Sequence, residues 1–186
     1  MSHSARFRLP LFLASALTVA AALAAVNNLD SAKSTITATF TQAGVPVESP
    51  FKTFTGRIVY DPANVAASSA ELEVVTGSLD IGDEAYNEEV RNKQWFDVAT
   101  YPKATFKSTA IKTTGQGRFD ATGILTVKGK AHTITVPITA KTSKDGLSFD
   151  GKFTLSRKAF GLGDPLWEEV LEDKVGVQFR LVSSGK

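Results

Sequence analysis

Apolar and polar residues alternate along most of the chain from residue 35 onward. Phe149, Gly151 and Phe153, for example, alternate with Asp150 and Lys152. A period of two is typical of a β-strand that buries one face. The pattern recurs in eight segments, at residues 35–40, 53–60, 69–74, 104–110, 119–128, 133–140, 147–155 and 175–181. The chain is therefore predicted to be an all-β protein.

Turn residues separate these segments, as at Gly115-Gln116-Gly117, Gly129 and Asp145-Gly146. Such short connections join antiparallel neighbours, whereas parallel strands need a long crossover. A sheet with one apolar face must bury it by closing on itself or by packing on a second sheet. We expect an eight-stranded antiparallel up-and-down barrel, and a two-sheet sandwich is the alternative.

One gap, at residues 77–102, is long enough to hold a helix. Asp83 is the expected N-cap of a short helix over residues 84–91. This insertion is rich in aromatic residues and should lie at one end of the barrel, either as a lid that moves or as a plug that completes the core. Four of its residues are candidates for contact with a ligand at the barrel mouth: Tyr86, Val90, Trp95 and Phe96.

The alternation also predicts which side chains face the barrel interior. A barrel of eight strands is just wide enough to be filled by side chains or to hold one small ligand. Small inward residues, namely Ser108, Ala110, Gly123 and Gly151, favour a tunnel over a core filled by phenylalanines. Buried apolar surface stabilises by ~25 cal/mol per Å², so a hydrocarbon chain is the predicted guest. The candidate lumen residues are Phe40, Phe54, Ile58, Phe106, Ser108, Leu125, Val136, Phe149, Phe153 and Phe179.

The first 24 residues differ from the rest of the chain. Arg6 and Arg8 precede an apolar stretch over residues 9–23, which ends in Ala22-Leu23-Ala24. This order is typical of a secretory signal peptide. The stretch is shorter than the ~20 residues needed to span a bilayer, which argues against the alternative of a membrane anchor. We predict a signal peptide over residues 1–24, a single lipid-binding barrel domain over residues 25–186, and a periplasmic location.

Cleavage changes the charge balance, because it removes two of the 21 basic residues and leaves the 19 acidic residues in place. The mature chain then has no net formal charge, so the composition indicates no nucleic-acid partner. The absence of cysteine excludes thiol catalysis and disulfides.

The remaining polar residues indicate no catalytic or metal site. His132 would be the only histidine after cleavage; it is expected to point inward near the barrel rim, and neither a nucleophile nor an orienting acid lies beside it. The acidic group Glu168, Glu169, Glu172 and Asp173 lacks the alternating ligands of a calcium loop and is predicted to be a solvated face. We therefore predict no catalytic residue, no metal and no cofactor apart from a bound lipid.

Five segments, in order, carry a resemblance to a known family. They are Phe51-Lys52-Thr53-Phe54-Thr55-Gly56; Ser78-Leu79-Asp80-Ile81-Gly82; Trp95-Phe96-Asp97-Val98 with Tyr101-Pro102-Lys103-Ala104-Thr105-Phe106; Gly123-Ile124-Leu125-Thr126-Val127-Lys128-Gly129; and Arg157-Lys158-Ala159-Phe160-Gly161-Leu162-Gly163. From about residue 30 to residue 181 the chain resembles the YceI-like family of periplasmic lipid- or polyisoprenoid-binding proteins. The resemblance implies a lipocalin-like barrel with an isoprenoid tail in its lumen. It also adds Phe160 and Trp167 to the candidate ligand contacts.

The end of the last segment, with Trp167, is similar to the branch of this family found beside cytochrome b561-type membrane proteins, which handle quinones. The resemblance thus implies a polyisoprenoid or prenyl quinone as ligand and a cytochrome b561-type protein as partner. A homodimer is left open. The leading hypothesis is a non-catalytic carrier. The alternatives are an accessory protein of such a cytochrome and a barrel-type lipid isomerase or cyclase.

Overall fold

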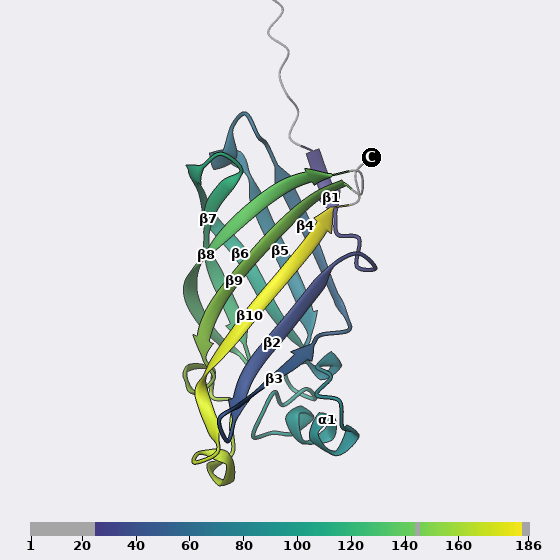
Figure 1. Ribbon diagram of the computed structural model, residues 1–186, viewed down its shortest axis with the longest axis vertical. Helices are drawn as coiled ribbons and strands as arrows, with labels where there is room; N and C mark the ends of the chain where they lie inside the picture. Colours follow the sequence, from purple (N-terminus) through teal and green to yellow (C-terminus); the bar gives the residue numbers. More distant parts are fainter. Residues whose placement is uncertain (1–24, 144–145, 184–186) are drawn as a thin grey trace, which may run out of the picture.

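The computed structural model describes residues 25–143 and 146–183. These residues form one antiparallel sheet of ten strands, in the order β1-β4-β5-β6-β7-β8-β9-β10-β2-β3, which curls around a central axis (Figure 1). The strands are β1 (Ala25–Asn28), β2 (Thr35–Gln42), β3 (Val45–Pro50), β4 (Phe54–Tyr60), β5 (Ser69–Val75), β6 (Lys103–Gly115), β7 (Arg118–Val127), β8 (Lys130–Ser143), β9 (Gly146–Ser156) and β10 (Leu171–Ser183). The predicted signal peptide over residues 1–24 lies outside the described residues and stays a prediction.

All eight predicted strands are present, as β2 and β4 to β10, so the antiparallel barrel is confirmed. From β4 to β10 each strand pairs with the next one along the chain. Lys128 and Gly129 link β7 to β8 with φ angles of 48° and 72°. Two consecutive positive φ angles are typical of the tight hairpin turn that matches the twist of the strands.

The predicted helix is α1 (Glu84–Arg91), and it is the one α-helix among the described residues. The Asp83 carboxylate caps it by accepting hydrogen bonds from the backbone N–H groups of Ala85 (2.9 Å) and Tyr86 (3.3 Å). Four short 3-10 helices lie in the loops: η1 (Val65–Ala67), η2 (Thr76–Ser78), η3 (Lys158–Phe160) and η4 (Pro165–Trp167).

Two strands, β1 and β3, were not predicted, and they change how the barrel closes. In a simple up-and-down barrel β2 would pair with β4, but here β2 pairs with β10 on one side and β3 on the other. Pro46 and Pro50 mark β3 as an edge strand, since proline cannot donate to a sheet ladder. The ladder is therefore interrupted by a seam between β3 and β1.

Backbone hydrogen bonds bridge this seam at both ends of the barrel. At one end the Asp30 N–H donates to the Val182 carbonyl (2.8 Å), and at the other the Lys52 N–H donates to the Ser78 carbonyl (3.0 Å). Isolated bridges accompany them, between Leu29 and Ser183 and between Phe51 and Leu79. The barrel is thus closed by the segments that flank β1 and β3.

The predicted inward faces are buried along most of the barrel. One buried cluster consists of Ile36, Phe54, Ile58, Phe149 and Leu181, and a second, toward α1, of Leu125, Val127 and Phe160. The exception is Ala110, for which the inward prediction is wrong. A bulge in β6 shifts the register between Ser108 and Ala110, so that Ile111 pairs with the buried Ala121 while Ala110 is exposed.

The Ser34 hydroxyl stabilises the closure beside β1, because it donates to the Asp30 carbonyl (2.7 Å) and accepts from the Val182 N–H (2.9 Å). Ser34 is only 7% exposed. We expect Ser34→Ala to lower the free energy of unfolding by about 1–3 kcal/mol, because the buried Val182 N–H loses its partner. Urea denaturation measures this change. Lys33→Ala is the control, since it removes only an exposed ion pair with Asp30 and should cost less than about 1 kcal/mol. Equal losses in the two variants would contradict this role of Ser34.

Candidate functional site

A cavity of about 270 Å³ lies inside the barrel. All eight of the predicted strands contribute side chains to its wall, together with α1 and the β9–β10 connection. Native interiors contain few voids larger than a water molecule, so a space of this size is not a packing defect. It approaches the roughly 300 Å³ at which ligand pockets begin.

The cavity is long and narrow. Leu171 and Leu181, near the two ends of β10, both line it. At ~3.3 Å per residue and a strand tilt of ~40°, their separation corresponds to roughly 25 Å along the barrel axis. One cavity that extends over that length is a tunnel. The tunnel suits an extended chain better than a compact molecule.

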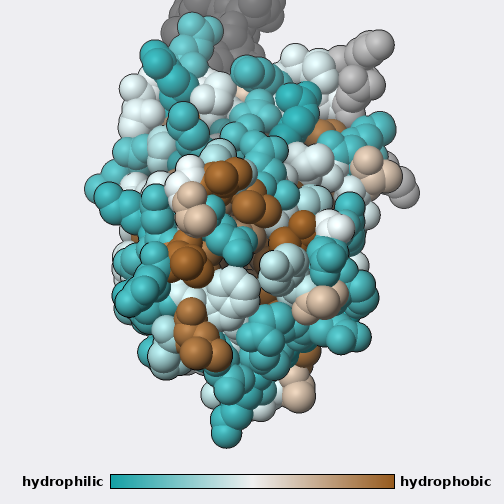
Figure 2. All heavy atoms as spheres, turned by 60° about the horizontal axis from the view of Figure 1, so that its bottom comes forward, coloured by the Kyte–Doolittle hydropathy of each residue, from teal (hydrophilic) through white to brown (hydrophobic). Residues whose placement is uncertain are grey.

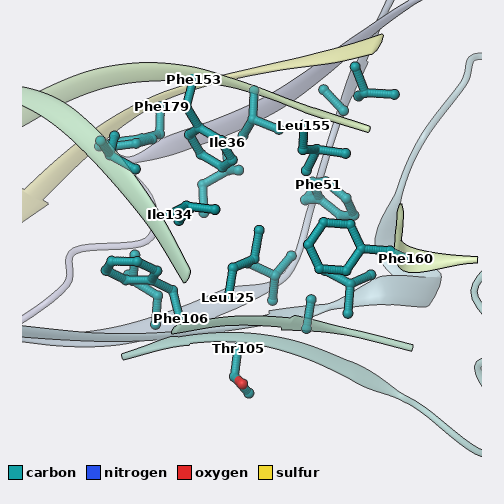
Figure 3. A pocket seen from close by; sticks show the side chains of 18 of the residues that line it. Ile36, Phe51, Thr105, Phe106, Leu125, Ile134, Phe153, Leu155, Phe160 and Phe179 are labelled. Atoms are coloured by element: carbon teal, nitrogen blue, oxygen red, sulfur yellow. The ribbon is translucent and has the colours of Figure 1, made fainter. Parts of the chain in front are cut away.

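The tunnel wall is almost wholly apolar. Figure 3 shows Phe106, Leu125 and Phe153 from different strands facing a common space, with Thr105 pointing away on the far side of its strand. This arrangement follows from the period-two alternation, which turns the threonines and lysines of each strand outward. The middle of the tunnel therefore offers contact with hydrocarbon and no acid–base pair among the described residues.

The structure brings most of the predicted site residues to this cavity. Eight of the ten strand candidates line it, as do all six candidates from the mouth: Phe40, Ile58, Phe106, Leu125, Val136, Phe149, Phe153, Phe179, Tyr86, Val90, Trp95, Phe96, Phe160 and Trp167. Their role in ligand binding stays a prediction, because the structure holds no ligand.

Two of the predicted lumen residues on the strands, Phe54 and Ser108, do not line the cavity. Phe54 is buried in the core cluster with Ile36 and Ile58 and does not line the cavity. At the β6 bulge, the Ser108 hydroxyl accepts a hydrogen bond from the Ala70 N–H (2.9 Å). The hydroxyl thus replaces the next backbone pair of the β5–β6 ladder, and Ser108 does not line the cavity.

The inward glycines have a different role from the one expected. A Cβ atom at Gly151 would lie 2.4 Å from Cζ of Phe179, and one at Gly123 would lie 2.5 Å from Cζ of Phe106. Each glycine is therefore the place where an aromatic ring of a neighbouring strand lies against the wall, an arrangement known from designed sheets. The glycines keep the tunnel open indirectly, by letting these rings lie flat.

Figure 1 shows α1 and the β9–β10 connection at the same end of the barrel. Side chains from both line the tunnel there. Figure 2 looks toward this end and shows apolar side chains gathered among hydrophilic ones. The rings of Tyr86 and Trp167 meet edge to face across this end, with centroids 6.2 Å apart. Leu166, next to Trp167, is 88% exposed. The mouth is thus closed from two sides, by α1 and by η4.

Hydrogen bonds attach the α1 side of the mouth to the barrel. The Lys128 ammonium donates to the carbonyls of Gln94 (3.0 Å) and Gly161 (2.8 Å), and its partial burial lowers the pKa of Lys128. The Arg91 guanidinium donates to the Gly77 carbonyl (3.2 Å), and the Trp95 indole N–H joins the segment after α1 to the Glu89 carboxylate of α1 (3.0 Å). These hydrogen bonds favour a plug that completes the core over a moving lid for the segment that follows α1.

The η4 side, residues 164–170, is held more loosely. Most of its hydrogen bonds are local, such as those from the Leu166 N–H to the Asp164 carboxylate (2.8 Å) and from the Trp167 N–H to the Asp164 carbonyl (3.0 Å). Glu168 adds an ion pair with Lys158, and the Ala43 N–H donates to Val170. If one side of the mouth moves, these contacts favour η4 over α1.

Arg157 was not among the predicted site residues, although it is the most buried charged residue on the cavity wall. Its side chain is 2% exposed. Its guanidinium donates to the carbonyls of Glu172 (3.0 Å), Leu162 (3.0 Å) and Leu171 (2.9 Å). An Arg-Lys pair at the end of a strand is typical of exposed charges, so the sequence pattern predicts that Arg157 is solvated rather than buried. The one signal is Gly163, where a Cβ atom would lie 2.2 Å from Nη1 of Arg157.

The other polar candidates have structural partners. His132 does not line the cavity, contrary to its predicted inward direction: it is exposed, its Nε2 lies 3.2 Å from the Ala159 carbonyl oxygen, and its ring packs on Phe160. In the acidic group, Asp173 is not simply solvated. Hydrogen bonds from the Lys158 N–H (2.9 Å) and the Ser156 hydroxyl (2.8 Å) lower its pKa.

Within ranges 25–143 and 146–183, no cluster of three or more histidine, cysteine or acidic side chains is placed to hold a metal ion. Nor does any helix of these ranges have the length and apolar character to cross a membrane.

Known proteins share the sequence pattern and the fold of this chain. Residues 28–183 match the family described as the YceI-like domain. The crystal structure of Burkholderia cenocepacia BcnA is 41% identical, with a TM-score of 0.81 over 84% of this chain and 99% of that one. A polyisoprenoid binding domain from Saccharophagus degradans, implicated in plant cell wall breakdown, is 18% identical, with a TM-score of 0.72 over 88% of this chain and 99% of that one. The latter likeness concerns the fold.

A curated relative, a UPF0312 protein of Pseudomonas savastanoi pv. phaseolicola, is 33% identical over 129 residues, which are 64% of this chain. The chain spans about 65% of that relative's length. A UPF0312 protein of Vibrio cholerae is 37% identical over 90 residues, or 48% of either chain.

Gly151→Ala tests whether the packing of the Phe179 ring against the wall depends on the absence of a side chain at Gly151. The new methyl group should push the ring into the tunnel, lowering the free energy of unfolding by about 1–3 kcal/mol and reducing uptake of an apolar chain. Gly176→Ala on the adjoining strand is the matched control, since its nearest atom would be the Thr39 carbonyl oxygen at 3.7 Å. Thermal denaturation and a binding assay with a fluorescent fatty-chain probe measure both effects. Wild-type behaviour of Gly151→Ala would show that the ring does not depend on this glycine.

Hydrogen exchange tests which side of the mouth moves. We expect backbone amides at 164–170 to exchange faster than those at 84–98, because most hydrogen bonds of η4 are local. An apolar ligand in the tunnel should slow exchange at 164–170 more than at 84–98. Faster exchange and greater protection in the α1 segment would favour the lid at α1 instead.

Proposed function

The chain belongs to the YceI-like family, and we propose that it binds one long isoprenoid lipid in its tunnel and carries it without transforming it. The observation that carries this proposal is the narrow apolar tunnel along the barrel axis. Its wall complements a hydrocarbon chain and little else, because each polar group placed there would lose its hydrogen bonds to water.

The apolar wall supplies the driving force for binding. Each Å² of hydrocarbon surface removed from water contributes ~25 cal/mol, and a chain inside the tunnel is surrounded on all sides. A branched, unsaturated chain fits a wall in which large residues such as Phe153 and Val136 are interrupted by small ones such as Ala70. The S. degradans relative, described as a polyisoprenoid binding domain, supports the choice of an isoprenoid.

A carrier is favoured over an isomerase or cyclase by the engagement of the polar residues near the tunnel. The Glu89 carboxylate accepts from the Trp95 indole, and the His132 ring contacts Ala159 and Phe160. Within the part of the chain that the structure describes, these groups do not form a proton-transfer pair at the tunnel centre. We further propose export to the periplasm, on the basis of the apolar N-terminal segment at residues 1–24.

Native mass spectrometry of the protein, purified under mild conditions from its own host, tests the proposal directly. We expect one bound lipid per chain with fragments typical of an isoprenoid. A protein that neither retains such a lipid nor takes up an added prenyl chain would contradict the proposed function.

The tunnel itself can be blocked at Ala70, a small residue on its wall. Ala70→Leu should lower affinity for a prenyl chain at least about ten-fold, while a side chain that enters existing space need not destabilise the fold. Ser69→Leu is the matched control, because Ser69 is exposed on the outer face of the same strand. Equilibrium binding and thermal denaturation separate the two effects. Equal affinity in both variants would place the lipid outside the barrel.

A further inference from the structure

Among the polar side chains that line the tunnel at its mouth end, Gln42, Arg157 and Trp167 lie near the start of β10, whereas Tyr86, Glu89 and Trp95 belong to α1 and the segment that follows it. Gln42 lies directly opposite Leu171 in the pairing of β2 with β10, and the Arg157 guanidinium donates to the Leu171 carbonyl (2.9 Å). Glu168, the neighbour of Trp167, approaches Nη2 of Arg157 at 3.8 Å. These contacts bring the three side chains together around the start of β10.

Their hydrogen-bonding capacity is not used up within the protein. Among the described residues, the Gln42 side-chain amide and the Trp167 indole N–H have no hydrogen-bond partner, although both side chains line the cavity. Arg157 makes three hydrogen bonds, all to carbonyls, while a guanidinium carries five N–H groups. Unused donors on an otherwise apolar wall are typical of a ligand site that fixes orientation.

We propose that this end of the tunnel is the head-group site, where Gln42, Arg157 and Trp167 donate hydrogen bonds to an uncharged oxygen acceptor such as a quinone carbonyl. Tryptophan and arginine side chains only donate, so the group they receive must accept. The lipid then lies with its tail toward Tyr60 and its head at the mouth. This inference rests on the proposed function and specifies its ligand.

The charges at the mouth favour an uncharged head over a phosphate. The segment from residue 164 to residue 173 contains five acidic residues and no lysine or arginine: Asp164, Glu168, Glu169, Glu172 and Asp173. On the opposite side, α1 carries Glu84, Glu88 and Glu89 against Arg91. The basic residues around this end are Arg91, Lys128, Lys130, Arg157, Lys158 and Lys174. They are six against the eight acidic residues, so a phosphate group here would lie within range of more negative than positive charge. A carbonyl oxygen accepts from the same donors without that repulsion.

The test compares three ligands on the mature protein: a prenyl quinone, the chain-matched prenyl phosphate, and squalene, which has no head group. The variants are Gln42→Leu, which replaces the amide with an apolar side chain, and Trp167→Phe, which removes the indole N–H and retains a ring to face Tyr86. Gln178→Leu is the control, because Gln178 is exposed on the outer face of β10. Equilibrium uptake of radiolabelled ligands gives the preference for quinone over squalene.

We expect wild type to prefer the quinone over both other ligands. Gln42→Leu and Trp167→Phe should each reduce its preference for quinone over squalene by about five-fold, the effect of one hydrogen bond. Gln178→Leu should leave that preference unchanged.

Three outcomes would overturn the inference: equal losses for quinone and squalene, no change in either variant, or tighter binding of the phosphate than of the quinone. If wild type binds none of the three ligands, it is the proposed function that fails. If wild type binds squalene and the quinone equally, only the head-group site fails.

Discussion

The apolar inner wall of the barrel is the constraint on which the rest of the structure depends. A sheet with one apolar face must exclude water from it, yet a barrel of this size leaves a central space that the inward side chains do not fill. The Phe106 and Phe179 rings resolve part of this conflict by lying on Gly123 and Gly151 rather than projecting to the axis. What remains is a dry, narrow space whose most favourable occupant is another hydrocarbon.

Keeping that space dry requires closure at the seam and at the mouth. At the seam, strands β1 and β3 do not pair with each other. Backbone hydrogen bonds such as those from Asp30 to Val182 and from Lys52 to Ser78 join the segments that flank these two strands. At the mouth, the segment that follows α1 is held by the partly buried Lys128 ammonium, whereas η4 has few bonds to the barrel. A binding protein needs one region of low local stability to admit its ligand, and such regions have few buried contacts. The η4 side meets that description better than α1.

In the function that we propose, affinity and orientation come from different parts of the tunnel. The strands supply a continuous apolar wall, which holds a chain but does not distinguish one end of it from the other. The polar atoms of Arg157, Gln42 and Trp167 lie at one end, so they break this symmetry. The three carbonyls around the Arg157 guanidinium also hold the β9–β10 connection in place. One buried side chain thus contributes to both the shape of the mouth and its chemistry.

Local sequence patterns determined the eight main strands, the inward face of each apart from the end of β6, and the helix that begins after Asp83. These are local properties: alternation records which side of a strand meets water, and a cap lies next to the helix that it caps. Eight of the ten predicted lumen residues from the strands follow from the same local rule. The family resemblance added Phe160 and Trp167 at the mouth.

Only the tertiary structure decided what depends on neighbouring strands. The β6 bulge turned Ala110 outward and assigned the Ser108 hydroxyl to Ala70, because register is a relation between two strands. The rings over the glycines and the burial of Arg157 likewise depend on residues distant in sequence. A charged residue in a sequence is expected to be solvated. Arg157 can be buried because its guanidinium donates hydrogen bonds to carbonyls of the β9–β10 connection and of β10.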